Sequence, residues 1–210
     1  MRDDGLHVEG YPEAKRVAQL KTMKAKRLAD MRLHQSDLGF CERVLQIFSA
    51  TLGDEPNDAA QALWISVLTK FYSCFGNNKG RSQLDAQNVY KGNPEALTAF
   101  RFYSNIRNKH IVHDESNYNY SFTGVVLGPE ADVQDILSLQ FQAVVSDAAN
   151  GQLMYNLVDA ALKYVSLQVD ALLAEILKEV HALSPQGRAA LPDIKFIAPT
   201  VGDEGERRKH

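Results

Sequence analysis

The sequence contains little cysteine, and this scarcity argues against thiol chemistry. Its 210 residues include two cysteines, Cys41 and Cys74. Each lies within an apolar pattern of helical period, and neither belongs to a CxxC pair. We therefore expect two buried free thiols rather than a disulfide or a zinc site.

Long apolar runs are also absent. No window approaches the roughly 18 apolar residues that a membrane-spanning helix requires. The first ten residues, MRDDGLHVEG, are charged and lack the apolar core of a signal peptide. These absences predict a cytoplasmic protein without a membrane partner. The hydrophobic content of 45% is enough for one sizeable core.

An excess of positive charge is missing as well. The formal net charge of −3 argues against a protein whose whole surface binds nucleic acid. One N-terminal segment differs, because it is rich in cations and holds few acids, namely Glu13 and Asp30. Its cations are Lys15, Arg16, Lys21, Lys24, Lys26, Arg27 and Arg32. We expect this segment to form either a solvated helix face or a flank that contacts phosphates.

Apolar residues recur at helical spacing along most of the chain, which predicts a mainly α fold. The expected helices run from 13 to 33, from an N-cap at Ser36 to about 52, from 57 to 75, from Pro94 onward, and from 151 to 183. Residues 76–93 are rich in glycine and asparagine and should form a functional or mobile loop with two cations, Lys79 and Arg81.

After His113 the apolar period changes from about 3.6 residues to about 2, which predicts strands. The segments YSFTGVVL, at 120–127, and ILSLQFQAVV, at 136–145, flank a turn-rich stretch. We therefore expect a β-hairpin over about 119–145, inserted between two helices of the bundle.

The expected organisation is a single helical domain of residues 12–183 that contains the hairpin. Residues 1–11 are expected to be a flexible N-terminus, and residues 201–210 a disordered tail. Residues 184–200 should form a short helix or an extended docking segment.

The densest group of chemically active side chains lies in the segment SNIRNKHIVHDES. On a regular α-helix, at about 100° per residue, Arg107 shares a face with Tyr103, His110 and Asp114. His113 follows Arg107 by six residues and points about 120° away from it. Joint action of Arg107 and His113 therefore requires a helix that ends near this point, or a second subunit beside it.

Two simple interpretations of this group are a metal site and a purely structural helix end. A metal site would use His110 and His113 with Asp114 or Glu115 as ligands. The sequence has no HExxH motif, however, and neighbouring cations oppose a divalent ion, so we expect no metal. In the structural interpretation, Arg107 and Asp114 form an ion pair and the histidines fill the end of the helix.

Metal-independent phosphoryl transfer fits the same residues better. A histidine titrates near neutral pH and moves protons, which accelerates such reactions by roughly 10² to 10⁴. The fork of an arginine suits phosphate oxygens and stabilises charge that develops on phosphorus. Asn108 would orient the phosphate, and Asp114 would hold the tautomer of a neighbouring histidine.

The segment RNKHIVH, from Arg107 to His113, resembles the R-X(4–6)-H signature of the HEPN superfamily, in which a polar residue such as Asn108 typically follows the arginine. The context is similar too, because the motif ends a late helix and a long helix follows. The resemblance implies a bundle of four or five helices, here with an inserted β-hairpin. It also implies a homodimer in which the motif helices of two protomers meet.

The implied activity is that of an endoribonuclease without metal or cofactor, of the abortive-infection or toxin type, with an RNA substrate and a possible antitoxin partner. Arg107 and His113 would be catalytic and Asn108 their polar helper. His110 lies in the variable spacer, so it is at most an outer residue of the site, as are Asp114 and Tyr103. Contacts to the RNA backbone are expected from Lys79, Arg81 and Lys109. The alternative is a non-catalytic module of this fold that binds nucleotide, RNA or a protein.

Overall fold

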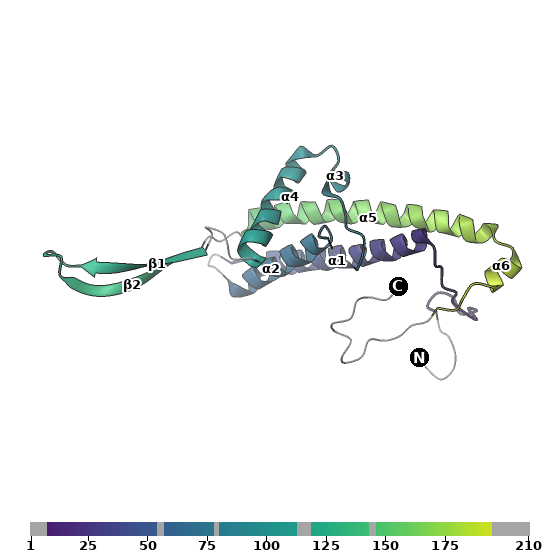
Figure 1. Ribbon diagram of the computed structural model, residues 1–210, viewed down its shortest axis with the longest axis horizontal. Helices are drawn as coiled ribbons and strands as arrows, with labels where there is room; N and C mark the ends of the chain where they lie inside the picture. Colours follow the sequence, from purple (N-terminus) through teal and green to yellow (C-terminus); the bar gives the residue numbers. More distant parts are fainter. Residues whose placement is uncertain (1–7, 54–56, 78–79, 113–118, 143–145, 195–210) are drawn as a thin grey trace, which may run out of the picture. The chain divides into compact units, whose positions relative to one another are not determined.

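The structure is a computed structural model, and it describes residues 8–53, 57–77, 80–112, 119–142 and 146–194. Within these ranges the chain forms six α-helices, one π-helical segment, η1, and two strands (Figure 1). In chain order they are α1 (Met23–Thr51), α2 (Asp58–Ser73), α3 (Ala86–Val89), α4 (Pro94–Ile106), η1 (Arg107–Val112), β1 (Asn119–Leu127), β2 (Val133–Gln142), α5 (Ala148–Ala182) and α6 (Pro185–Ala189). The prediction of a mainly α fold with a β-hairpin is confirmed.

Helix α1 corrects the prediction, because one continuous helix replaces the two that were expected at 13–33 and after Ser36. It begins at Met23, where the Thr22 hydroxyl accepts the N–H of Ala25 at 3.1 Å. Ser36 lies inside the helix, since no glycine or proline interrupts the chain there and buried positions continue across it at spacings of three and four. These buried positions are Met31, His34, Leu38, Cys41, Leu45 and Phe48.

Residues 12–22 do not form the expected helix and pair instead with the C-terminal segment. Ala18 forms an antiparallel β-bridge with Asp193, and the N–H of Ile194 donates to the carbonyl of Val17 at 3.0 Å. The backbone groups of this segment are therefore satisfied by a distant part of the chain rather than by a helix.

The chain divides into two compact units, and α1 and α5 contribute residues to both. The first unit comprises Met1–Leu33, Lys79–Ser82 and Leu167–His210, and the second comprises His34–Asn78 and Gln83–Ser166. The described part of the predicted motif and the hairpin both belong to the second unit.

Charged side chains link α1 to α5 in the first unit. Lys24 Nζ lies 2.8 Å from Glu175 and 2.7 Å from Glu179, and these hydrogen bonds raise the pKa of Lys24. Arg16 likewise pairs with Asp193 at 2.8 Å. Such exposed pairs contribute little to the stability of the fold. They do give carboxylate partners to two of the N-terminal cations, which makes these two poorer phosphate ligands.

Helix α2 supplies much of the core of the second unit. The Asn57 side chain caps it by accepting the N–H of Ala59 at 2.8 Å. Four residues of its predicted apolar face are buried, Trp64, Val67, Leu68 and Phe71, and the other two, Leu63 and Phe75, are half-buried. Aromatic rings continue this core, with Phe75 centred 5.1 Å from Phe71 and 4.8 Å from Phe100 on α4. Helix α2 thereby forms the support for α4 and η1.

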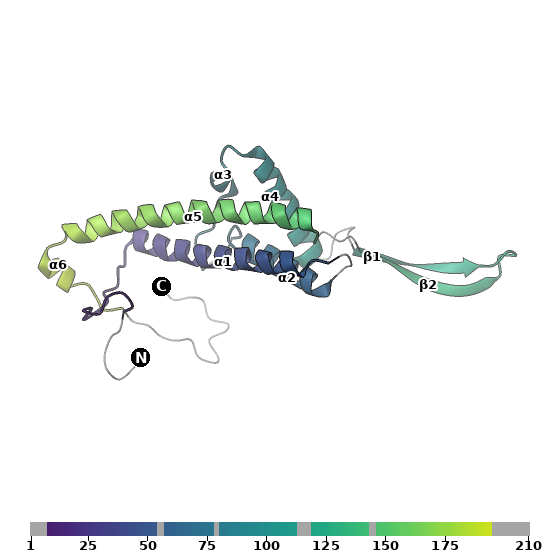
Figure 2. The ribbon, with the colours of Figure 1, turned by 180° about the vertical axis from the view of Figure 1, so that it is seen from behind.

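Strands β1 and β2 form the predicted hairpin, and they twist about each other in the reverse view of Figure 2. They pair antiparallel from Asn119 opposite Gln142 to Leu127 opposite Val133, with a bulge next to Leu127. The second strand begins three residues before the expected position, 136, and residues 143–145 of that prediction lie outside the described residues.

Two helical glycines are expected to respond in opposite ways to alanine, which normally stabilises a helix interior by roughly 0.5 to 1 kcal/mol. At Gly39 in α1 the nearest atom to an added Cβ is the end of the Arg43 side chain, at 3.5 Å, so Gly39→Ala should be stabilising. At Gly151 in α5 an added Cβ would lie 2.6 Å from Phe48 Cε1, so Gly151→Ala should destabilise by about 1 to 3 kcal/mol. Denaturant unfolding measures both, and equal stabilisation would contradict the packing of Phe48 on α5.

Two expectations about the helices and the cysteines can be compared with the structure. Within the described ranges, no helix is long and apolar enough to cross a bilayer. Cys41 and Cys74 are free and buried, which confirms the prediction. Burial raises the pKa of the Cys41 thiol to about 12, so this thiol stays protonated at neutral pH.

Candidate functional site

Helix α4 leads into the candidate site. It begins as the sequence predicts, with Pro94 in its first turn and the Asn93 side chain accepting the N–H of Ala96 at 3.0 Å. Tyr103 and Ile106 are its buried residues. These two side chains anchor the last turn of α4 and thereby orient the segment that follows.

The segment Arg107–Val112 is π-helical rather than α-helical. In a π-helix each N–H bonds five residues back instead of four, and such turns are rare and frequently occur at functional sites. The expected α-helical phase therefore ends at Ile106. The angle of about 120° between Arg107 and His113, which assumed a regular α-helix, does not apply.

Arg107 and Asn108 form the described centre of the site. Arg107 is partly buried, and its Nη1 donates to Asn108 Oδ1 at 2.8 Å. Its Nε is buried and has no hydrogen-bond partner among the described residues. A buried donor that lacks a partner normally costs about 1 to 3 kcal/mol. The bond to Asn108 thus restrains the orientation of the guanidinium.

Tyr103 is a buried residue that stabilises the fold next to the candidate site. Its side chain is fully buried, its ring packs edge-on against Trp64 at 5.6 Å, and its hydroxyl donates to Asn150 Oδ1 at 2.6 Å. Asn150 is in turn held by Asp147, whose carboxylate accepts the Asn150 backbone N–H at 2.8 Å. Tyr103 therefore fastens α4 to the start of α5, one turn before Arg107.

The buried phenol of Tyr103 gives a pH-dependent prediction. Burial, and then the charge of Asp147, raise the pKa of Tyr103 to about 12. In the unfolded chain this pKa is near 10, so the folded state retains the proton over a range in which the unfolded state loses it. This contribution is complete below about pH 10 and is lost as the pH rises toward about 12. Tyr103→Phe should remove it, and the loss of stability at alkaline pH should become shallower.

Denaturant unfolding at a series of alkaline pH values measures this effect. Tyr11→Phe is the matched control, because Tyr11 is 70% exposed. Tyr103→Phe should also cost about 1 to 3 kcal/mol near neutral pH, since the Asn150 side chain loses its donor. Identical pH profiles of the wild type and Tyr103→Phe would contradict the buried position of this hydroxyl.

The other predicted site residues are only partly described. His113, Asp114 and Lys79 lie outside the described residues, as does the side chain of His110. Lys109 is exposed beside Arg107 and Asn108. Arg81 belongs to the first compact unit. The structure therefore joins Arg107 to Asn108 and leaves the remaining predicted contacts as predictions.

Metal-ligating groups do not cluster in the described part of the chain. No group of three or more histidine, cysteine, aspartate or glutamate side chains there could hold a metal ion. The four residues considered as ligands from the sequence all lie beyond this search, since the side chains of His110, His113, Asp114 and Glu115 are not among those described.

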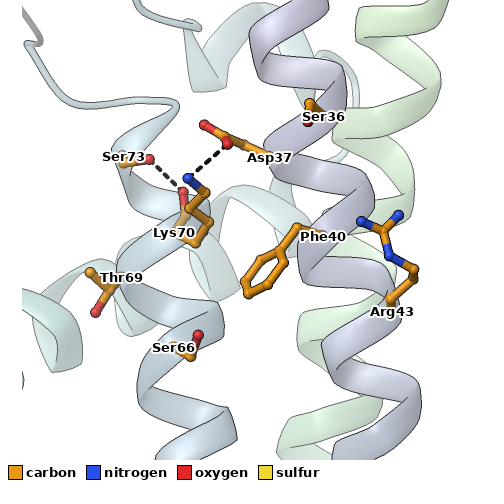
Figure 3. A pocket seen from close by; sticks show the side chains of 8 residues that line it. All are labelled: Ser36, Asp37, Phe40, Arg43, Ser66, Thr69, Lys70 and Ser73. Carbon is orange, nitrogen blue, oxygen red and sulfur yellow. Dashed lines mark hydrogen bonds and ion pairs between the residues drawn. The ribbon is translucent and has the colours of Figure 1, made fainter. Parts of the chain in front are cut away.

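A second feature, which the sequence did not indicate, is a hollow between α1 and α2 (Figure 3). It measures about 700 Å³ and is lined by Ser36, Asp37, Phe40, Arg43, Ser66, Thr69, Lys70 and Ser73. Lys70 Nζ pairs with Asp37 Oδ1 at 2.8 Å, and the Ser73 hydroxyl donates to the Lys70 carbonyl at 2.7 Å. Of the two cations that line this hollow, Lys70 and Arg43, the first already faces a carboxylate, and we assign the hollow no part in phosphate chemistry.

Comparison of the chain with models of protein families, with curated protein sequences and with solved structures finds no match. The resemblance to the HEPN superfamily therefore depends on the motif residues and on their helical context.

Proposed function

We propose that this protein is a metal-independent endoribonuclease of the HEPN type that acts as a homodimer in a phage-defence or toxin–antitoxin setting. The observation that carries the proposal is the coincidence of the rare π-helical segment with the motif that begins at Arg107. The bond from Arg107 to Asn108 supports it, because a preoriented guanidinium is the group that phosphoryl transfer needs.

The proposed reaction is an internal transesterification of RNA. The ribose 2′-oxygen attacks the adjacent phosphorus and loses its proton, while the bond from phosphorus to the 5′-oxygen of the next nucleotide breaks and that oxygen gains a proton. The products are a 2′,3′-cyclic phosphate and a 5′-hydroxyl. In this scheme His113 moves protons as general base or general acid.

Arg107 and its neighbours would stabilise the phosphate. The arginine fork binds two of its oxygens as negative charge accumulates in the transition state, and Asn108 holds the fork in position. Lys109 is exposed next to them and would contact the RNA backbone as a point charge. In a homodimer two such sets would line one groove.

The direct test is incubation of the wild-type protein and His113→Ala with total cellular RNA in EDTA. We expect cleavage by the wild type and none by His113→Ala, because histidine does not need a metal to move a proton. Lys178→Ala, which removes an exposed cation from the first unit, is the control for charge loss and should cleave normally. Cleavage that EDTA abolishes would favour a metal enzyme instead.

The alternative is a non-catalytic module that binds nucleotide, RNA or a protein partner. The exposed apolar side chains of the hairpin favour a binding role of some kind. Failure of the wild type to cleave RNA in both EDTA and Mg²⁺, together with RNA binding in a gel-shift assay, would identify the protein as such a module.

A further inference from the structure

One side of the β1–β2 hairpin is an apolar surface. Directly opposed residues of an antiparallel pair project from the same face. Three opposed pairs form this surface, which we call the hairpin face: Tyr120–Phe141, Phe122–Leu139 and Gly124–Leu137. The Tyr120 and Phe141 rings stack at 5.2 Å, and those of Phe122 and Phe141 at 5.6 Å. These stacked rings give the face an ordered surface.

The hairpin face is about half exposed, and its apolar side chains adjoin one another. Its five large side chains are each between 43% and 49% exposed. The opposite face is polar over its first three rungs, where the Thr123 and Ser138 hydroxyls lie 3.5 Å apart, and it becomes apolar toward the turn, where Val125 lies opposite Ile136. A two-stranded hairpin is marginally stable alone in water, and an amphipathic sheet normally buries its apolar side. The hairpin face therefore requires a cover.

Gly124 indicates the shape of that cover. Its φ lies outside the left-handed region, and a Cβ added to it would meet nothing within 4 Å. Neither the backbone nor crowding within the hairpin therefore requires glycine, although glycine weakens a strand. A glycine in a strand interior often marks the close approach of another group. Here it leaves a hollow beside Phe122 and directly opposite Leu137.

We propose that the hairpin face packs against the same face of a second copy of this chain. A two-fold axis parallel to the strands places the Leu137 side chain of each copy over the Gly124 hollow of the other. The contact is isologous, so each copy contributes the same Leu137 side chain and the same hollow at Gly124. The same operation sets Tyr120 against Phe141 and Phe122 against Leu139, in pairs that suit aromatic and aliphatic packing.

The available area suits such a dimer. Five side chains that are about half exposed present at most roughly 100 Å² each, so complete burial would cover at most about 500 Å² per copy and about 1,000 Å² per pair. About 1,000 Å² is the lower bound for a specific interface. The face carries no charge between its first and third rungs, and Asp135 at the next rung marks its end.

The charges of the hairpin argue against other occupants. Glu130, Asp132 and Asp135 lie at or near its turn, and neither strand contains a lysine or arginine. Nucleic acid and anionic membranes are both bound through cations. A second apolar protein surface has no such requirement, and the self-complementarity of the hairpin face identifies that surface as its own copy.

Association of the full chain tests the proposal in two ways. In sedimentation velocity, the wild type should be a dimer at micromolar concentration, and Gly124→Val should raise the dimer dissociation constant at least tenfold by filling the hollow. Valine favours strands, so this change should not unfold the hairpin. Thr123→Val, on the opposite face one residue away, is the matched control and should leave the dissociation constant unchanged.

Crosslinking then locates the contact. Cys41 and Cys74 are buried and should not react with a crosslinker, so an introduced cysteine would supply the reactive thiol. A thiol crosslinker that spans about 10 Å, the spacing of packed sheets, should link copies of Leu137→Cys but not of Ser138→Cys, whose side chain projects from the other face.

The inference does not rest on the proposed ribonuclease activity, and the two fail separately. A dimer whose dissociation constant Gly124→Val leaves unchanged would overturn the interface alone, and so would a dimer in which Leu137→Cys is not crosslinked. A monomeric wild type at tens of micromolar would overturn both the interface and the homodimeric nuclease. A crosslinked dimer that does not cleave RNA would support the interface and count against the nuclease alone.

Discussion

Replacement of Arg107 by alanine is expected to slow RNA cleavage by about 10² to 10³, or about 3 to 4 kcal/mol of transition-state stabilisation. In the proposed site the guanidinium meets charge that appears only as the 2′-oxygen attacks. Its loss should therefore lower kcat more than it raises KM. Arg107→Lys should have intermediate activity, because it keeps the charge and loses the fork. Single-turnover cleavage of a defined RNA measures all three proteins.

Arg101→Ala is the matched control for this experiment. Arg101 is an exposed arginine on α4, six residues before Arg107, and its removal should change the cleavage rate little. Folding must be preserved for the comparison to hold. The one hydrogen bond that the Arg107 side chain makes among the described residues, to Asn108, is worth about 1 kcal/mol. Arg107→Ala should therefore melt within a few degrees of the wild type.

The structural interpretation of the motif predicts instead that the alanine variants are unstable. If Arg107 and His113 only stabilise a helix end, both alanine variants should lose several kcal/mol of stability, and activity should fall in proportion to the unfolded fraction. Thermal unfolding followed by circular dichroism, run on the same samples as the cleavage assay, separates the two cases.

Phe48→Ala is expected to destabilise the folded chain by about 3 to 5 kcal/mol, the usual cost of removing a large ring from a core. Phe48 is fully buried on α1, its ring lies 5.7 Å from Trp64, and it fills the space beside Gly151 of α5. For a chain of this length the melting temperature should fall by roughly 10 °C. Denaturant unfolding measures the free energy directly.

The neighbouring residue supplies the control for this prediction. Ile47 is 55% exposed on the same helix, so Ile47→Ala should change stability by less than about 1 kcal/mol. The effect of Phe48→Ala should also reach the candidate site, because Phe48 contacts Trp64 and Trp64 contacts Tyr103 just before Arg107. Equal losses in the two variants would refute the position of Phe48 in the core.

Local patterns predict much of this fold. Helix α2 begins after its predicted first residue, Asn57, and helix α4 begins at Pro94, as the sequence predicts. Most of the apolar side chains that repeat at helical spacing in α2 are buried. The hairpin follows from its alternation of apolar and polar residues. Each of these features depends on neighbours within a few residues, which is the range over which a sequence can be interpreted directly.

The features that the sequence does not predict depend on distant residues. A cap at Ser36 is locally reasonable, yet the burial of His34 and Leu38 continues α1 through it. Residues before Met23 pair with Asp193 and Ile194, at the other end of the chain. No local signal identifies these partners.

In the candidate site, too, some features are local in the sequence and others depend on the folded chain. The adjacency of Arg107 and Asn108 is visible in the sequence, but their hydrogen bond is not, because neighbouring side chains on a helix do not normally face each other. The π-helical turn and the bond from Tyr103 to Asn150 are not visible, because the first changes the backbone phase and the second joins residues far apart in the chain.

The most direct test of the proposed chemistry is the structure of the RNA ends that the wild-type protein leaves in EDTA. Transesterification through the 2′-oxygen predicts a 2′,3′-cyclic phosphate on one fragment and a 5′-hydroxyl on the other, both absent with His113→Ala. A 5′-phosphate with a free 3′-hydroxyl would mean that water attacked the phosphorus instead, and it would contradict the roles proposed for Arg107 and His113.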